Sequence, residues 1–238
     1  MKTGLNWPIA PGDGQLSPDE VHVWAVSVEG FCARVTELHS LLSEEERQRA
    51  ARFHFEKDRL RFITARGILR IILASYLNET PQALSFGYGR NGKPDLVQAS
   101  ELKFNLSHAD DVVLFALTKN REIGVDVEKV QDYPDIDSVA KRFFLPGEIN
   151  DLERFSGEGK LKEFYRYWTR GEALLKWSGE GIVEPAERQA ITNQFNGTVR
   201  ELASAPNYAA AVAVTGKSLA FIERQWSPAT AIPSSCHK

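Results

Sequence analysis

The sequence predicts an α+β fold, and three observations lead to this prediction. Val21–Val28 alternates apolar with small or polar residues, which is typical of a strand with one buried face. Arg61–Leu77 and Lys160–Trp177 read as long helices. Val112–Leu117 and Ile123–Glu128 read as adjacent strands joined by a short polar turn. This mixture of helices and hairpin-like strands favours α+β over a doubly wound sheet.

Local signals predict the remaining elements. Ser43-Glu-Glu-Glu46 is a capping box, in which serine and glutamate satisfy each other's backbone amides, so a helix should follow it. The others are an irregular start over 1–19, a loop over Gly87–Pro94, a helix near Ser138 that breaks at Pro146-Gly147, a strand over Tyr208–Thr215, and a Pro- and Ser-rich end that we expect to be mobile.

Composition restricts the class of protein. With 238 residues, 42% hydrophobic residues and a net charge of −3, the chain is globular rather than disordered or fibrous. We find no apolar stretch of the roughly 18–20 residues that cross a membrane, and no signal peptide. Two cysteines, Cys32 and Cys236, form no disulfide framework, so we expect a cytoplasmic protein without a membrane partner.

An internal similarity suggests two related halves. Arg61-Phe-Ile-Thr64 and Arg166-Tyr-Trp-Thr169 match in residue type, and each follows an Arg-Phe pair, Arg52-Phe53 and Arg142-Phe143. The spacing differs between the two copies, so coincidence is an equal alternative. If the similarity reflects duplication, the halves divide near the turn at 119–122.

Basic residues concentrate between Arg47 and Arg70, where eight basic side chains accompany only Glu56 and Asp58. A solvated helix face is one interpretation. A phosphate-rich ligand or an acidic protein partner is the other, because arginine supplies bidentate, permanently charged donors. The overall negative charge disfavours a nucleic-acid-binding module. Gly92-Lys93-Pro94 adds a further point charge on a turn.

Three more segments carry candidate chemistry. Phe104-Asn-Leu-Ser-His108 brings Ser107 and His108 to a strand, as ligand contacts or as structural hydrogen-bonding groups. In the strand Ile123–Glu128, Asp126 and Glu128 share one face. Two carboxylates so close favour a hard divalent ion such as Mg²⁺, although a solvent-facing strand edge is the simpler alternative.

The third segment is the helix that ends near Trp177. Its Trp168, Glu172 and Lys176 recur every four residues and share a face, so Glu172 and Lys176 form either a surface ion pair or part of a site. Gly171 costs this helix about 1 kcal/mol relative to alanine. Taken together, the segments predict Mg²⁺-dependent transfer of a phosphate-linked group, and no Walker loop or zinc spacing competes with that prediction.

This ordered set of motifs resembles the Sfp-type 4′-phosphopantetheinyl transferases. The resemblance runs from about Ser43 to Ile182 and is carried by Gly92-Lys-Pro94, Phe104-Asn-Leu-Ser-His108, Ile123-Gly-Val-Asp-Val-Glu128, Lys141-Arg-Phe-Phe144 and Trp168-Thr-Arg-Gly-Glu-Ala-Leu-Leu-Lys176. It implies a pseudo-dimer of two similar α+β halves with the active site in the cleft between them. The expected halves are 1–120, with the coenzyme A-binding helices and the Gly-Lys-Pro loop, and 121–238, with the metal-binding strand and the Trp/Glu/Lys helix.

The resemblance also implies an activity and its residues. The phosphopantetheine arm would move from coenzyme A to a serine of an apo acyl or peptidyl carrier protein of fatty-acid, polyketide or peptide synthesis, releasing adenosine 3′,5′-bisphosphate. A monomer would suffice. The implied metal ligands for Mg²⁺, or for Mn²⁺ in its place, are Asp126, Glu128 and Glu172. The implied coenzyme A contacts are Arg49, Arg61, Lys93, Ser107, His108 and Lys176, and the implied catalytic residues are Asp126, His108, Glu172 and Lys176.

Gly171 departs from the family pattern, which usually has lysine immediately before the metal-binding glutamate. Arg170 lies about 100° away around the helix and is an imperfect replacement. We therefore expect an active enzyme that works without this lysine, and keep as the alternative a catalytically weakened homologue that binds coenzyme A or a carrier protein.

Overall fold

The computed structural model describes residues 5, 7–9, 15–132, 135–203 and 205–229. Its helices are η1 (Glu29–Arg34), α1 (Val35–Ser40), α2 (Glu44–Ala51), α3 (Glu56–Leu77), η2 (Pro81–Ala83), α4 (Ile136–Phe143), α5 (Pro146–Leu152), α6 (Gly157–Ser178) and α7 (Pro185–Gln194). Its strands are β1 (Glu20–Ser27), β2 (Phe86–Tyr88), β3 (Pro94–Leu96), β4 (Leu102–Ala109), β5 (Val112–Lys119), β6 (Ile123–Lys129), β7 (Gly197–Glu201), β8 (Tyr208–Thr215) and β9 (Ala220–Gln225).

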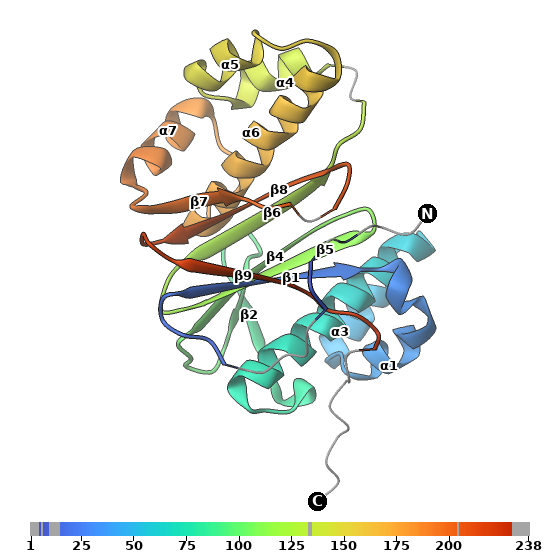
Figure 1. Cartoon of the computed structure of the whole chain (residues 1–238). Helices are drawn as coiled ribbons and strands as arrows, with labels where there is room; N and C mark the ends of the chain where they lie inside the picture. Colours follow the sequence, from blue (N-terminus) through green and yellow to red (C-terminus); the bar gives the residue numbers. More distant parts are fainter. Residues whose placement is uncertain (1–4, 6, 10–14, 133–134, 204, 230–238) are drawn as a thin grey trace, which may run out of the picture.

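Two sheets form the centre of the molecule (Figure 1). The first has the order β4-β5-β1-β9, with β9 parallel to β1 and the other pairs antiparallel. The second is antiparallel with the order β6-β8-β7. The short strands β2 and β3 form a separate hairpin. The α+β prediction is confirmed, with two halves that each combine a sheet and helices.

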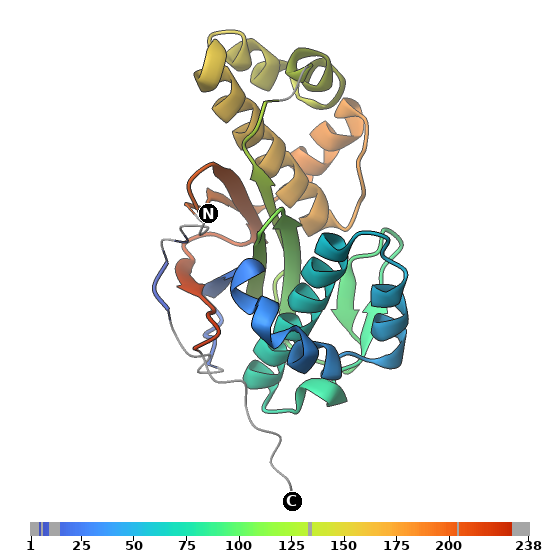
Figure 2. The ribbon, with the colours of Figure 1, turned by 90° about the vertical axis from the view of Figure 1, so that its right-hand side faces the viewer.

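The layers follow from the faces that each sheet buries. Trp24 and Phe115 of the first sheet pack with Leu69 of α3 in one core. Val23, on the opposite face of that sheet, packs against Val125 of the second sheet in another core. Helix α6 covers the outer face of the second sheet. Figure 2 shows the helices α1–α3 in the lower part of the view and α4–α7 in the upper part, with strands of the two sheets between them.

This layering corrects two expectations about the strands. Residues 21–26 of β1 are buried without interruption, whereas the alternation predicted one buried face, because both faces of the first sheet are covered. Strands β5 and β6, expected to be adjacent, are not hydrogen-bonded to each other and belong to different sheets. The turn between them carries the chain from one sheet to the other.

The tail contains more strand than the sequence predicts. Strand β8 has the predicted bounds, but β7 and β9 were missed. Both are short and partly exposed, and β9 ends in the polar residues Glu223, Arg224 and Gln225, so neither shows the apolar run of a buried strand. Because β9 pairs with β1, the end of the described chain completes the first sheet. A boundary at residue 120 stays a prediction.

Local sequence signals predict some helix starts correctly and others not. The capping box is confirmed: the Glu46 amide donates to Ser43 Oγ (3.2 Å) and the Ser43 amide donates to Glu46 Oε2 (3.0 Å). Helix α3 begins at Glu56, before the predicted start at Arg61, and Pro146 opens α5 rather than only ending a helix. The predicted loop at 87–94 includes parts of the β2–β3 hairpin. The predicted mobile end falls largely on 230–238, outside the described residues.

Within the described residues, every helix is too short or too polar to cross a lipid bilayer.

Candidate active site

A cavity of about 520 Å³ lies where β4 and β6, edge strands of the two sheets, meet. Helices α2, α3 and α6 and the β2–β3 turn complete its walls. Of the residues predicted from the sequence, those that line it are Arg49, Lys93, Ser107, His108, Asp126, Glu128, Glu172 and Lys176. Arg61 is the predicted contact that is not part of the cavity wall. The structure therefore brings together side chains that lie far apart in the sequence.

Two polar residues of β4 join the sheets at this seam. Asn105 Oδ1 accepts a hydrogen bond from the Val125 amide (2.9 Å), and Ser107 Oγ donates to Asp126 Oδ1 (2.9 Å). Both residues of β4 are buried. The Asn-Leu-Ser-His segment thus positions β6, in addition to lining the cavity.

The two faces of β6 divide as the alternation predicts. Ile123, Val125 and Val127 lie in the core between the sheets, while Asp126 and Glu128 line the cavity. Gly124 shares the face of the carboxylates and has a separate function. A Cβ atom there would overlap the Ala173 carbonyl oxygen and the backbone of the next helical turn. Glycine therefore allows α6 to lie directly against β6.

This close approach brings Lys176 to Asp126. Lys176 Nζ lies 2.7 Å from Asp126 Oδ1 and 2.9 Å from Ser107 Oγ. Lys176 therefore does not form the surface ion pair with Glu172 that was the alternative. Its ammonium pairs with Asp126 of β6 instead. Asp126 is 3% exposed, and its second oxygen, Oδ2, has no hydrogen-bond partner among the described residues.

The three carboxyl groups of the site share one electrostatic environment. Burial, followed by the negative charge of Asp126, raises the pKa of Glu128 to about 7. Burial and then Asp126 also raise the pKa of Glu172. Burial raises the pKa of Asp126 itself, and the Lys176 ammonium opposes that effect. These acids repel each other, so a cation among them would stabilise their charged forms.

The donor set fits a hard divalent cation. In the described part of the chain, no three acidic, His or Cys side chains already converge on one point as a preformed metal site. Mg²⁺ does not require such a cage, because it binds through one or two carboxylates together with waters and phosphate oxygens. The buried, unpartnered Asp126 Oδ2 is a ligand atom of the right kind. Asp126, Glu128 and Glu172 are the residues that would hold the ion.

The opposite wall of the cavity is basic, and it includes a residue that the sequence analysis did not single out. Arg66 is buried, donates from Nη2 to Tyr88 Oη (2.8 Å), and has no partner for Nη1 among the described residues. Its nearest carboxylate, Glu46, lies 3.8 Å away and is held at 2.7 Å by Arg70. Arg49 lies nearby, its guanidinium 5.3 Å from the Phe62 ring centroid. The sequence contains no signal that distinguishes Arg66 from the other arginines of the basic cluster. Its place in the cavity wall is visible only in the structure.

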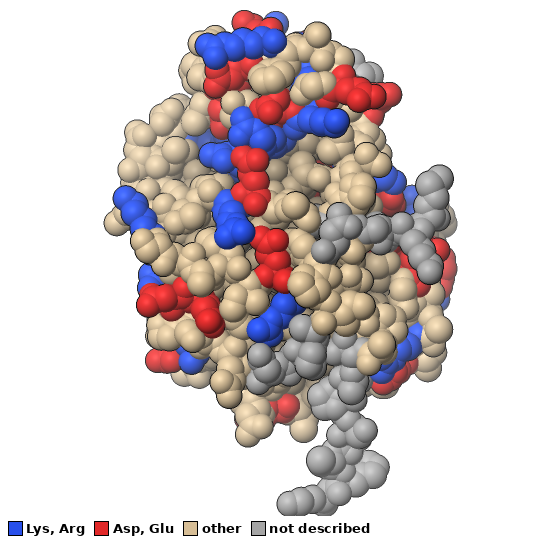
Figure 3. Space-filling view, in the orientation of Figure 1, with Lys and Arg blue, Asp and Glu red and all other residues tan. Residues whose placement is uncertain are grey.

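Three arginines of the basic cluster pair with a carboxylate three residues earlier in the chain, as the solvated-face interpretation expects, whereas Arg70 pairs with Glu46 in the interior. The ion pairs are Arg47–Glu44, Arg59–Glu56, Arg61–Asp58 and Arg70–Glu46. Arg61 still influences the site, because its charge, after burial, lowers the pKa of His108. Elsewhere on the surface both signs of charge intermix, as on the face in Figure 3. An ion pair between Arg200 of β7 and Glu223 of β9 (3.2 Å) even links the two sheets.

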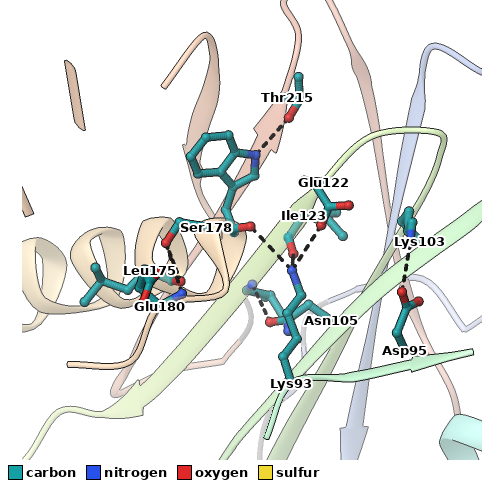
Figure 4. Close-up of polar contacts among 12 residues, drawn as sticks. Lys93, Asp95, Lys103, Asn105, Glu122, Ile123, Leu175, Ser178, Glu180 and Thr215 are labelled. Atoms are coloured by element: carbon teal, nitrogen blue, oxygen red, sulfur yellow. Dashed lines mark hydrogen bonds and ion pairs between the residues drawn. The ribbon is translucent and has the colours of Figure 1, made fainter. Parts of the chain in front are cut away.

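Lys93 has a different environment from the exposed turn that the sequence predicts. Figure 4 shows its side chain reaching from the β2–β3 turn to the start of β6. Its Nζ donates to the Ile123 carbonyl (3.1 Å) and the Trp177 carbonyl (3.5 Å), and lies 3.4 Å from Glu122. Burial lowers the pKa of Lys93. The lysine thus ties the first half to β6 and α6, and its contact with coenzyme A stays a prediction.

Trp168 does not accompany Glu172 and Lys176 into the cavity. Its ring packs against Phe164 and Phe143, with centroids 6.1 and 5.9 Å away. It lines a small adjoining pocket together with Gly171, Glu172 and Arg188. Trp168 therefore lies outside the cavity wall that Glu172 and Lys176 share, although a hydrogen bond from its side chain opposes the rise in the pKa of Glu128.

Comparisons with known proteins match both halves of the chain. Residues 24–120 match the family model "4′-phosphopantetheinyl transferase, N-terminal", and residues 122–221 match "4′-phosphopantetheinyl transferase superfamily". The 4′-phosphopantetheinyl transferase HetI of Nostoc sp. is 39% identical over 222 residues, which is 88% of this chain and 94% of that protein. The transferase Sfp of Bacillus subtilis is 27% identical over 160 residues, 67% of this chain and 70% of that protein.

Proposed function

This chain belongs to the 4′-phosphopantetheinyl transferase superfamily, and on that premise we propose the reaction that it catalyses. The enzyme transfers the 4′-phosphopantetheine arm of coenzyme A to a serine hydroxyl of an apo acyl or peptidyl carrier protein. The serine oxygen forms a bond to the phosphorus that carries the arm, and the bond from this phosphorus to the bridging oxygen breaks. Adenosine 3′,5′-bisphosphate leaves.

The observation that supports this proposal is the division of charge within one cavity. Asp126, Glu128 and Glu172 contribute carboxylates, while Arg49 and Arg66 contribute guanidinium groups on another wall. A ligand with a diphosphate and a further phosphate has anionic groups for both environments, provided that a cation accompanies the carboxylates. Coenzyme A has this distribution of charge.

The basic wall would bind and orient the nucleotide. Arg66 is desolvated and keeps an unpartnered N–H group, so a phosphate oxygen would supply the acceptor that the described residues do not. Arg49 adds a second guanidinium. His108 also lines the cavity, and its lowered pKa favours the neutral imidazole, which can donate one hydrogen bond to a phosphate oxygen.

Lys176 and Glu172 would act at the reacting atoms. An ammonium has three donors, so Lys176 can reach a phosphate oxygen while it keeps its contacts with Asp126 and Ser107. There it would stabilise the negative charge that develops on the phosphoryl oxygens. Glu172 lines the same cavity as Lys176 and would accept the serine proton directly or through a water.

Mg²⁺, or Mn²⁺ in its place, would be held by Asp126, Glu128 and Glu172. When bound, it would neutralise charge on the diphosphate and on the leaving group. Both walls of the cavity come from a single chain, so we expect a monomer to be active, and light scattering of the purified protein measures this directly.

The test is transfer itself. The protein is incubated with coenzyme A, Mg²⁺ and a panel of apo carrier proteins from fatty-acid, polyketide and peptide synthesis, and each carrier is weighed by mass spectrometry. We expect at least one carrier to gain the mass of one arm, with adenosine 3′,5′-bisphosphate released in equal amount. A carrier whose acceptor serine is replaced by alanine is the control and should gain nothing.

The competing candidate is a homologue that binds coenzyme A or a carrier without transferring the arm, and Gly171 is the observation that favours it. It predicts saturable binding of coenzyme A by calorimetry together with unchanged carrier masses across the whole panel. Transfer to any carrier rejects it.

A further inference from the structure

Gly171 forms a notch in the side of helix α6. It is buried in the interior of the helix, where glycine is disfavoured, and its backbone does not have the positive φ that would require glycine. A Cβ atom built at Gly171 would lie 2.6 Å from Arg188 Nη2 and 2.8 Å from Arg188 Cζ. These distances are shorter than van der Waals contact. The guanidinium of Arg188 therefore fills the space in which a side chain at position 171 would begin.

Arg188 is fixed in this notch by several partners. It lies on α7 and is 5% exposed. Its two terminal nitrogens donate to the two carboxylate oxygens of Glu148 (2.7 and 2.8 Å), and Nη1 also donates to the Phe143 carbonyl (3.0 Å). Glu148 belongs to α5, and Phe143 ends α4. The guanidinium consequently connects α4, α5 and α7 to the middle of α6, and shifting it would disturb all four.

Glu172 is the next residue of the same helical turn. Arg188, Gly171 and Glu172 line one small pocket, and Glu172 also lines the main cavity. The positively charged Arg188 and the Glu172 carboxyl face the same small pocket, although the ion pair that Arg188 forms in the described structure is with Glu148. Arg188 does not line the main cavity itself, so it would influence the site through Glu172.

We propose that Arg188 is a positioning residue of the active site, which occupies the place of a side chain at position 171 and supplies the positive charge behind Glu172. The proposal rests on the proposed transferase function. It also explains why position 171 is glycine. The guanidinium of Arg188 reaches this place from α7, and only a residue without a side chain leaves room for it.

The first experiment measures this fit by stability alone. Gly171→Ala should lower the urea midpoint of unfolding, because the methyl group displaces the guanidinium. Gly159→Ala, in the same helix, is the matched control, since its Cβ would lie 3.8 Å from its nearest neighbour and should leave the midpoint unchanged or raised. An unchanged or raised midpoint for Gly171→Ala would overturn the proposal.

A double-mutant cycle then isolates the pair. In an Arg188→Met background, the flexible thioether leaves the notch accessible, so Gly171→Ala should cost much less than in the natural protein, or stabilise it. Equal costs in both backgrounds would show that the two residues do not compete for the same space. If Arg188→Met does not fold, Arg188→Lys replaces it, because lysine keeps the charge opposite Glu148 with a narrower head group.

The second experiment measures the influence on catalysis. We expect Arg188→Met to lower kcat about tenfold or more while KM for coenzyme A stays within about twofold, since Arg188 acts behind Glu172. Adding Gly171→Lys to Arg188→Met should restore kcat about fivefold or more, because a lysine can now enter the vacated notch. A folded Arg188→Met variant with unchanged kcat, or with the loss confined to KM, would overturn the positioning role.

The two experiments separate this proposal from the proposed function. If the natural protein transfers no arm, the function fails while the stability cycle still tests the fit between Arg188 and Gly171. If the natural protein is active and the cycle shows no coupling, only the role of Arg188 fails.

Discussion

The backbones of Gly124 in β6 and Ala173 in α6 are in direct contact. They lie so close that a side chain at Gly124 would overlap the Ala173 carbonyl oxygen. The contact sets the distance between the strand that carries Asp126 and the helix that carries Glu172 and Lys176. The 2.7 Å pair between Lys176 and Asp126 depends on it.

Gly124→Ala should destabilise the protein and reduce transfer together. The added methyl group meets the backbone of α6, which cannot rotate away, so we expect a loss of about 1–3 kcal/mol in the free energy of unfolding. Gly147→Ala is the control, since a Cβ there has nothing within 4 Å. Urea unfolding and the mass-shift assay measure both variants. Equal stability of the two would contradict the close contact.

Asp126→Asn should abolish most of the activity with little change in fold. The amide has nearly the same shape but lacks the charge that Lys176 and a divalent cation require, so we expect kcat/KM to fall about 100-fold or more. The matched control is Asp110→Asn, at an exposed aspartate that pairs with Lys129 outside the cavity. The measurement is the initial rate of carrier modification by each variant. A rate for Asp126→Asn close to that of the control would show that Asp126 is not needed for catalysis.

Arg66→Met should weaken binding of coenzyme A. Methionine keeps much of the apolar contact with Phe86 and Tyr88 but removes the unpartnered donor, so KM for coenzyme A should rise about tenfold or more. Arg59→Met is the control, because Arg59 pairs with Glu56 on the surface. Titration calorimetry with coenzyme A gives the same comparison without turnover. Equal affinities for the two variants would argue against a phosphate contact at Arg66.

The metal-free protein should lose stability as the pH rises. The pKa of Glu128 is about 7 in the folded protein against an ordinary value of 4.5, so the folded state binds the proton more tightly than the unfolded state. The contribution of protonated Glu128 to the free energy of unfolding is therefore fully present below pH 4.5 and is lost as the pH rises through about 7. The raised pKa values of Asp126 and Glu172 act in the same direction.

Urea unfolding in the presence of a chelator, compared between about pH 5.5 and about pH 8, measures this loss. Glu128→Gln should reduce the difference between the two conditions, while Glu158→Gln, at an exposed glutamate of α6, should leave it unchanged. Added Mg²⁺ should stabilise the natural protein more at the higher pH. A pH dependence that Glu128→Gln leaves intact would assign the effect to other groups.

The parts of the site that could be predicted are those encoded within one element. The alternation in β6 assigns Asp126 and Glu128 to one face without any knowledge of the fold. The period of α6 does the same for Glu172 and Lys176. The capping box at Ser43 is likewise a local interaction, and it forms as the sequence predicts.

The parts that could not be predicted depend on contacts between distant elements. The partner of Lys176 is Asp126 rather than Glu172, and this follows only from how α6 lies on β6. The sequence does not distinguish Arg66 from the neighbouring arginines, and only the structure shows that it is buried, lines the cavity and keeps one N–H group without a partner among the described residues. The reason for Gly171 lies on α7, and the burial of both faces of β1 depends on a second sheet.

The parallel pairing of β9 with β1 has a consequence for how the enzyme is made. The first sheet receives its edge strand from a segment about 200 residues downstream of β1, and such distant pairing is slow to form. A ribosome must therefore have synthesised the chain through β9 before β1 is covered at that edge. Until then, the exposed edge of a nascent intermediate is open to aggregation. Deletion of residues 220–225 should therefore leave a product that is translated but found in the insoluble fraction after lysis.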